Sequence, residues 1–135
     1  MLKAIDISAS ALAAQRTRMD ALAGNLANVS TTHNEDGQPE PYQPRYVTFA
    51  ADESVGTHGA VGVRVASIET SDAEPRLKYE PGHPDANADG YVAYPDINMM
   101  FELTDAMEAA RAYEANLGAI EISKDLGRQT LRILA

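Results

Sequence analysis

The residues best suited to chemistry lie between positions 85 and 96, where oxygen-bearing side chains recur at the spacing of a calcium-binding loop. Asp85, Asn87 and Asp89 alternate along the chain, Gly90 follows them, and Asp96 ends the segment. They match the first, third, fifth, sixth and twelfth positions of such a loop, and calcium prefers clustered carboxylate and amide oxygens. Prolines in the preceding segment exclude an entering helix, so we favour a turn rich in Asp and Asn. A small calcium-dependent binding module is the alternative.

The other reactive side chains do not form a known catalytic or metal-binding motif. His33, His58 and His83 lie 25 residues apart in predicted loops, without the close spacing or the cysteines of common zinc sites. The sequence holds no motif of serine hydrolases, phosphate-binding loops or zinc proteases. We therefore interpret the histidines as surface residues and predict a protein that is not an enzyme and uses no cofactor or metal.

The distribution of charge indicates which parts of the chain associate with other surfaces. The 135 residues have a net charge of −9 and include no cysteine. Residues 31–98 hold four basic and twelve acidic groups, whereas residues 1–30 and 99–135 have net charges of only +1 and −2. So acidic a chain is poorly suited to binding nucleic acid. The nearly neutral ends are expected to associate, and the acidic middle is expected to face solvent.

The segment 2–28 is predicted to form one helix, because it is rich in alanine and contains no proline. Ile5, Leu12, Met19 and Leu26 recur every seven residues, and Leu22 belongs to a second row. This spacing places apolar side chains on one face of a helix.

The N-terminal segment does not resemble a cleaved secretory signal, because polar residues at positions 6, 8 and 10 interrupt the apolar stretch that a signal needs. No apolar run reaches the length of a membrane-spanning helix. We therefore expect neither a cleaved signal nor direct insertion into a membrane.

Residues 98–134 are predicted to form a second, longer helix, with Asp96 or Asn98 as its N-cap. Acidic residues lie in its first turns and basic residues in its last turns, which suits the helix dipole. Its apolar row has spacings of three and four residues and is weakened at Lys124 and Gly127. The apolar members are Leu103, Ala106, Ala110, Tyr113, Leu117, Ile120, Leu131 and Leu134.

Two long helices at opposite ends of the chain predict a mainly α fold with a small β insertion. We expect the N- and C-terminal helices to form an antiparallel coiled coil, with the middle inserted at one tip. Residues 1–30 and 98–135 would form the helical assembly domain, and residues 31–97 the small β-containing, loop-rich insertion. The expected assembly interface comprises Ile5, Leu12, Met19, Leu22, Leu26, Leu103, Ala110, Tyr113, Leu117, Ile120 and Leu131.

The insertion combines a loop with short strands. Residues 30–45 are polar and rich in proline, which predicts a loop with extended segments. Alternating or β-branched patterns predict strands at residues 46–49, 61–65, 76–79 and 91–94.

Several motifs resemble those of the bacterial flagellar basal-body rod proteins of the FlgC type, which belong to the proximal rod. One is the Asn-Leu-Ala-Asn sequence at 25–28, followed by two threonines. The other matching segments are residues 6–19, 41–42, 79–86, 89–92, 94–98 and 110–116. The resemblance covers nearly the whole chain, with the motifs in order and at matching spacing. Departures at Gln43-Pro44 and at Asp96 affect local loop contacts.

The resemblance implies a structural, non-enzymatic axial subunit of the flagellar rod that polymerises through its terminal helices and transmits torque from motor to hook and filament. The implied partners are other rod proteins, copies of the chain, the rod-to-membrane-ring adaptor, the membrane ring and the flagellar export apparatus. The implied location is the periplasm-spanning rod of the basal body, reached without a cleaved signal peptide. The calcium interpretation loses weight, because the family motif around residues 85–90 carries no known metal.

Overall fold

The computed structural model describes residues 2–55 and 59–134, which form two long helices and two small antiparallel sheets. The elements follow in the order α1 (Leu2–Ala27), β1 (Arg45–Asp52), β2 (Gly62–Thr70), β3 (Arg76–Tyr79), β4 (Tyr91–Tyr94) and α2 (Met99–Leu134). Every predicted helix and strand is confirmed. β3 and β4 have the predicted bounds, whereas β1 and β2 are longer because their pairing continues beyond the apolar stretch.

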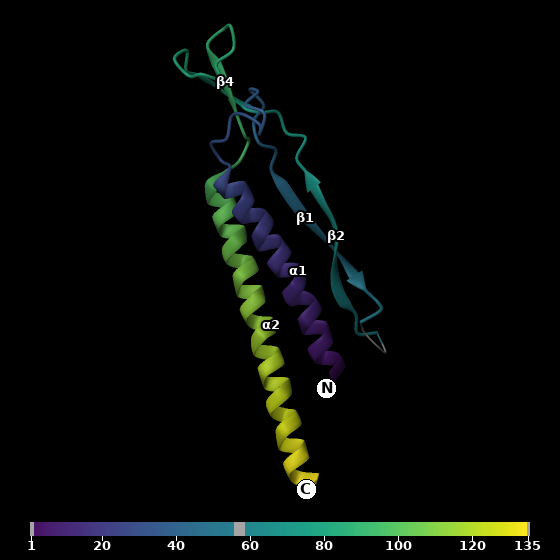
Figure 1. Cartoon of the computed structure of the whole chain (residues 1–135). Helices are drawn as coiled ribbons and strands as arrows, with labels where there is room; N and C mark the ends of the chain where they lie inside the picture. The colour runs from purple at the N-terminus through teal and green to yellow at the C-terminus, as the bar shows by residue number, and fades with distance from the viewer. Residues whose placement is uncertain (1, 56–58, 135) are drawn as a thin grey trace.

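The two helices lie side by side and run in opposite directions (Figure 1). Ala14 on α1 and Ala109 on α2 are almost completely buried, and such small side chains let two helices approach closely. Asn98 is the N-cap of α2, because its Oδ1 accepts hydrogen bonds from the backbone N–H groups of Met100 (3.0 Å) and Phe101 (3.4 Å).

At every second position of the predicted row from Leu103 to Leu117, the contact between the helices uses the preceding residue of α2 instead. Leu103, Leu117 and Leu131 are predicted in this contact but are 40, 43 and 69% exposed. Glu102 and Ala109 are buried instead. Among the other described members of the predicted row, Ile120 is buried and Lys124 is exposed, and the half-buried ones are Ala106, Ala110, Tyr113 and Gly127. The sequence pattern is misleading here because the close contact needs small or hydrogen-bonded side chains, which carry no apolar signal.

The β1–β2 hairpin lies along α1, on the side of α1 away from α2 (Figure 1). Its strands pair from Arg45 opposite Thr70 to Asp52 opposite Gly62, with an irregularity after Thr48. The expectation of an insertion at one tip is therefore wrong for this hairpin. Only the β3–β4 hairpin and the neighbouring loops form a head at the tip, which we define as residues 28–44 and 71–98.

The hairpin approaches α1 most closely at Gly62, which is buried. The Oγ of Ser10 accepts a hydrogen bond from the N–H of Val63 at 3.0 Å. A Cβ atom added at Gly62 would lie 2.8 Å from this Oγ and 2.9 Å from the Cβ of Val55. Only glycine fits between the strand and the helix without a displacement.

Gly62→Ala is expected to lower the free energy of unfolding by about 1–3 kcal/mol, because the new methyl group overpacks this contact. Urea denaturation measures the change. Gly82→Ala is the matched control, since no atom lies within 4 Å of the added Cβ there. Equal stability of the two variants would show that the hairpin does not pack on α1 as described.

The head has its own small core beneath the β3–β4 hairpin. Val92 is fully buried, and Ile97 is 3% exposed. On the exposed side of the hairpin, the rings of Tyr79 and Tyr91 meet edge to face across the two strands, with centroids 5.3 Å apart. This core holds the chain in place just before α2 begins.

Candidate functional site

A buried asparagine joins α1, β1 and α2 where the helix pair meets the head. The side chain of Asn25 is completely buried. Its Nδ2 donates to the carbonyl of Arg45 (2.9 Å) and to Oε2 of Glu102 (3.0 Å). Its Oδ1 accepts from the N–H of Arg45 (2.8 Å) and the hydroxyl of Tyr42 (3.1 Å). All four hydrogen-bonding positions of the amide are thus occupied, and the register between the helices is fixed.

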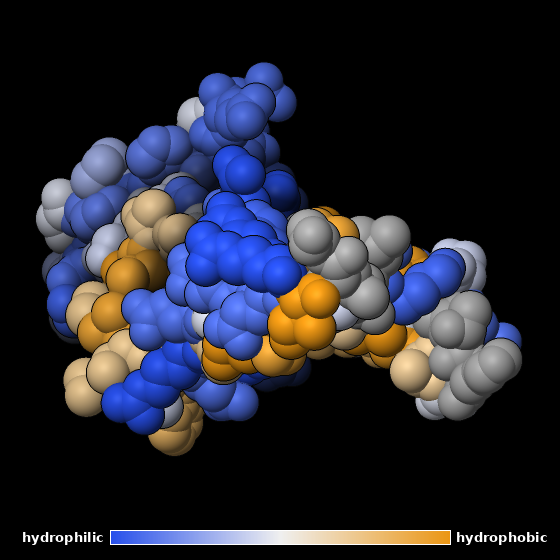
Figure 2. Space-filling view, turned by 90° about the horizontal axis from the view of Figure 1, so that it is seen from below, coloured by the Kyte–Doolittle hydropathy of each residue, from blue (hydrophilic) through white to orange (hydrophobic). Residues whose placement is uncertain are grey.

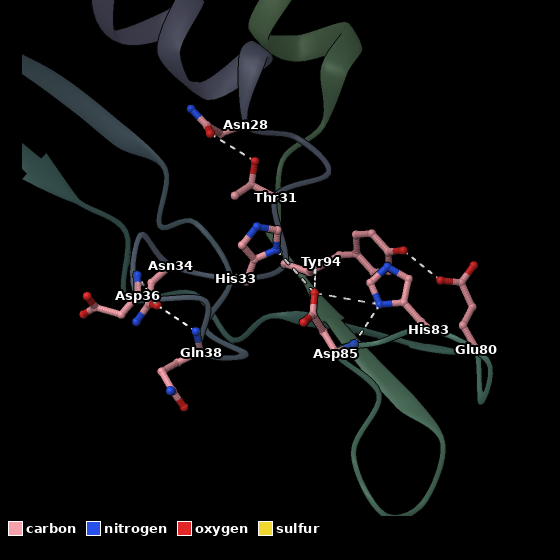
Figure 3. A network of polar contacts seen from close by, with 11 residues as sticks. Asn28, Thr31, His33, Asn34, Asp36, Gln38, Glu80, His83, Asp85 and Tyr94 are labelled. Carbon is pink, nitrogen blue, oxygen red and sulfur yellow. Dashed lines mark hydrogen bonds and ion pairs between the residues drawn. The ribbon is translucent and has the colours of Figure 1, made fainter.

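The turn after α1 is held by a second asparagine. Nδ2 of Asn28 donates to the carbonyl of Gly24 at 2.9 Å, and the hydroxyl of Thr31 donates to Oδ1 of Asn28 at 3.0 Å (Figure 3). The N–H of Tyr42 donates to the carbonyl of Thr31 at 3.1 Å. These bonds return the chain toward Asn25, so the two asparagines of the 25–28 motif act on one junction.

Asp85 ties the β3–β4 hairpin to the chain that leaves α1. Its Oδ2 accepts a hydrogen bond from the hydroxyl of the buried Thr32 at 2.6 Å and lies 3.4 Å from Nδ1 of His33. His83 approaches from the other side (Figure 3), but its Nδ1 accepts the N–H of Asp85 at 3.1 Å. The 3.8 Å separation of that nitrogen from Oδ2 is therefore a proximity rather than a hydrogen bond. The Thr32 hydroxyl is the main cause that lowers the pKa of Asp85.

Acid is expected to weaken the attachment of the hairpin. The pKa of Asp85 in the folded chain lies below its ordinary value of 3.8, so the ionised carboxylate stabilises the fold above that value. This contribution is lost as the pH falls through the folded pKa. Asp85→Asn is therefore expected to flatten the fall of the melting temperature below about pH 4.

Asp89→Asn is the matched control for this acid titration, because Asp89 is exposed in the same loop. It should leave the acid dependence as it is in the unaltered chain. If the melting temperature of Asp85→Asn falls in acid as steeply as that of the unaltered chain, the carboxylate does not hold the hairpin.

The oxygens of the proposed calcium loop are directed to other partners. Oδ1 of Asn87 accepts the N–H groups of Asp89 (3.0 Å) and Tyr91 (2.9 Å), and Oδ1 of Asp96 lies 3.6 Å from Nε of Arg76. Among residues 2–55 and 59–134, no three His, Cys, Asp or Glu side chains are grouped so that they could hold a metal ion. The segment is a turn rich in Asp and Asn, and the calcium alternative has no support.

Of the histidines interpreted as surface residues, His33 is exposed and His83 is half-buried. His33 and His83 stand on opposite sides of the Asp85 carboxylate (Figure 3), and His58 lies outside the described residues.

The residues predicted for the assembly interface are divided by the structure into an inner and an outer group. Leu22 and Ile120 are buried, and Tyr113 is half-buried. The row of α1 is half-buried and comprises Ile5, Leu12, Met19 and Leu26. On α2, Ala110 is half-buried, whereas Leu103, Leu117 and Leu131 are exposed. The inner group stabilises the single chain, and the outer group remains free for other contacts.

Exposed apolar side chains on α2 are more numerous than the sequence row indicates. Leu103 and Leu117 are spaced by two heptads, so they share one flank of the helix. The additional exposed residues are Met99, Met100, Phe101, Met107, Ile122, Leu126 and Ile133. Figure 2 shows the molecule from the end where the chain termini lie. Apolar residues stand there on both sides of a cluster of polar residues. The exposed apolar side chains of α2 lie on more than one face of the helix, and the exposed flank with Leu103 and Leu117 is one of these faces.

Ile122, Leu126 and Ile133 form a second heptad-like row on a different face of α2. Their spacing in the sequence therefore indicates part of the exposed apolar surface. The row predicted for α2 does not include these three residues. The methionines at the start of α2 have no such regular pattern, and only their exposure in the structure identifies them.

Comparison with known proteins gives one consistent relationship. Residues 5–33 match the family described as flagella basal body rod protein, and residues 88–133 match the C-terminal family of the flagellar basal body rod FlgEFG proteins. The chain is 40% identical over 133 residues to the flagellar basal-body rod protein FlgC of Salmonella typhimurium, covering 98% of this chain and 97% of that protein. The FlgC proteins of Borreliella burgdorferi and Bacillus subtilis are 37% and 36% identical, over 99% and 96% of this chain and 97% and 95% of theirs.

Proposed function

Since the chain belongs to the FlgC family of flagellar basal-body rod proteins and is thus a structural, non-enzymatic rod subunit, we propose that it polymerises through its terminal helices. In this proposal the rod that it helps to build transmits torque from the motor to the hook and filament. The family places the chain in the flagellar basal body, in assembly with other rod components.

The observation that carries the proposal is the exposed apolar flank of α2. Leu103 and Leu117 are 40% and 43% exposed although they belong to a regular heptad spacing. Burying apolar surface stabilises an association by about 25 cal/mol for each Å² removed from water. A neighbouring subunit that covers this flank would therefore bind without any rearrangement of the helix pair.

We also propose that α1 and α2 form an antiparallel coiled coil, with residues 1–30 and 98–135 as the assembly domain. The 3–4 spacing of the buried and half-buried positions of α2 supports this arrangement. Residues 31–97 form the second, outward-facing domain, because most of the acidic groups lie there and would repel one another in a crowded wall.

The remaining expected partners are proposals that rest on the family alone. They are the adaptor between rod and membrane ring, the membrane ring itself and the flagellar export apparatus, and they imply a rod that spans the periplasm. Within the described residues, neither helix has a stretch long and apolar enough to cross a membrane.

Purified basal bodies test the proposed function. In cells that carry a tagged copy of the chain as the only copy, the tag should copurify with the rod and remain there after the filament and hook are removed. Cells without the chain should lack rods and should not swim. Swimming cells without the chain, or basal bodies without the tag, would contradict the proposal.

A further inference from the structure

The C-terminal part of α2 extends beyond α1. The Asn25–Glu102 and Arg18–Asp105 contacts, at 3.0 and 4.0 Å, fix the register of the helix pair. Both helices rise by the same distance per residue. Counted from the Arg18–Asp105 contact, Leu2 at the start of α1 therefore lies beside residue 121 of α2, about 24 Å from that contact. Residues 124–134, which we call the tail, continue alone, as Figure 1 shows.

The tail has the composition of a helix that packs against another chain. Leu131 is 69% exposed, and Leu126 and Ile133, 53% and 84% exposed, lie on the other face of the helix. A helical end of about three turns gains little stability from propensity and depends on packing. Within the described residues, α1 begins at Leu2 and does not extend alongside the tail, so it does not supply that packing.

The charge of the tail differs from that of the rest of the molecule. Lys124, Arg128 and Arg132 against Asp125 give the tail a net charge of +2, in a chain of −9. The Arg128–Asp125 contact of 3.5 Å joins side chains that are 75% and 67% exposed, so it neutralises little of this charge. The partner of the tail should therefore be acidic as well as apolar.

An acidic, apolar surface exists at the other end of the same helix. Residues 99–108 hold three acidic groups and no basic one, but Glu102 is buried against Asn25. Asp105, half-exposed and 4.0 Å from Arg18, and Glu108, which is exposed, make this surface acidic. Phe101, 70% exposed, shares one flank of α2 with Asp105 and Glu108, since the three are spaced by four and three residues. In the tail, Arg128, Leu131 and Arg132 share a flank by the same rule, on a different side of the helix.

We propose that the tail flank of one copy, Arg128–Leu131–Arg132, docks on the Phe101–Asp105–Glu108 flank of a second copy. Two arginines would meet two carboxylates and Leu131 would meet Phe101, with the two copies staggered along the helix axis by about 40 Å. The two flanks are different surfaces, so the contact leaves one free at each end and repeats rather than closing into a dimer. This inference rests on the proposed function and specifies one of its contacts.

Charge reversal in the full-length chain tests the docking. The tail variant is Arg128→Glu/Arg132→Glu, and the acidic-flank variant is Glu108→Arg, which leaves the Arg18–Asp105 contact of the helix pair in place. Sedimentation at low salt is expected to show self-association of the unaltered chain, weakened about tenfold or more in either variant. A mixture of the two variants should associate again, because the acidic tail of one variant then meets the flank of the other variant that has gained a basic residue. The same association should weaken at high salt.

The matched control for the tail variant is Arg16→Glu/Arg64→Glu, which lowers the net charge by the same amount at two exposed residues outside both flanks. It should associate like the unaltered chain. The docking is wrong if the unaltered chain stays monomeric, if the tail variant associates normally, or if the mixture does not recover. The proposed function would survive each of these failures, because it depends on rods and swimming in cells.

Discussion

Leu117→Asp is expected to leave the free subunit folded and to prevent rod assembly, so that cells expressing only this variant do not swim. Leu117 is 43% exposed in the single chain, where a carboxylate can stay hydrated. In an assembled wall the same carboxylate would be buried without a partner, which costs about 3–5 kcal/mol in each contact. The measurements are circular dichroism of the purified variant, swimming in soft agar and electron microscopy of basal bodies.

Ile120→Asp separates loss of assembly from loss of folding. Ile120 is only 9% exposed in the contact with α1, so a carboxylate there should lower the stability of the free subunit itself. Normal swimming of cells with Leu117→Asp would exclude this flank of α2 as an assembly surface. Unfolding of the Leu117→Asp subunit would show that the residue belongs to the core of the single chain.

Asn25→Ala is expected to lower the free energy of unfolding by about 3–5 kcal/mol. The substitution leaves the buried Glu102 without the amide that donates to it, together with both backbone groups of Arg45 and the hydroxyl of Tyr42. A buried polar group left unpaired, here Glu102, costs about 1–3 kcal/mol, and the partly buried groups of Arg45 and Tyr42 add smaller amounts. Urea denaturation of the purified subunit measures the effect.

Asn116→Ala is the control for this prediction. Its Nδ2 donates only to the carbonyl of Ala112 in its own helix, at 2.8 Å, so its loss should cost less than about 1 kcal/mol. If the two variants are equally stable, the buried amide does not hold the three elements together.

The helices and strands could be predicted from the sequence because each has a regular pattern. Seven-residue repeats mark α1 and α2, and alternation marks β2. The direction in which the β1–β2 hairpin folds could not be predicted. It depends on the close approach of Gly62 to Ser10, two residues that are 52 positions apart in the chain.

The functional residues were only partly predictable. Leu103 and Leu117 were identified as interface residues by spacing, but spacing could not distinguish the contact within the chain from a contact between chains. Asn25 had no physical signal, since a polar residue inside an alanine-rich helix looks like a surface residue. Only its place in the 25–28 motif drew attention to it, and the structure supplies the reason in its four hydrogen bonds.

The calcium interpretation fails for a related reason. A turn and a calcium loop both use Asp, Asn and Gly at short spacing, because the side-chain oxygens that bind a cation also accept backbone N–H groups. Asn87 makes two such bonds, to Asp89 and Tyr91. Sequence spacing alone cannot show whether these oxygens bind a cation or accept hydrogen bonds from backbone N–H groups.

An electron cryo-microscopy map of basal bodies that contain this chain is the most direct test of assembly through the terminal helices. We expect α1 and α2 to lie in the wall of the rod, with residues 31–97 on its outer side. Side chains of a neighbouring subunit should contact Leu103 and Leu117 within about 4.5 Å. A map in which this flank of α2 faces open solvent in every copy, or in which the chain is absent from the rod, would contradict the account.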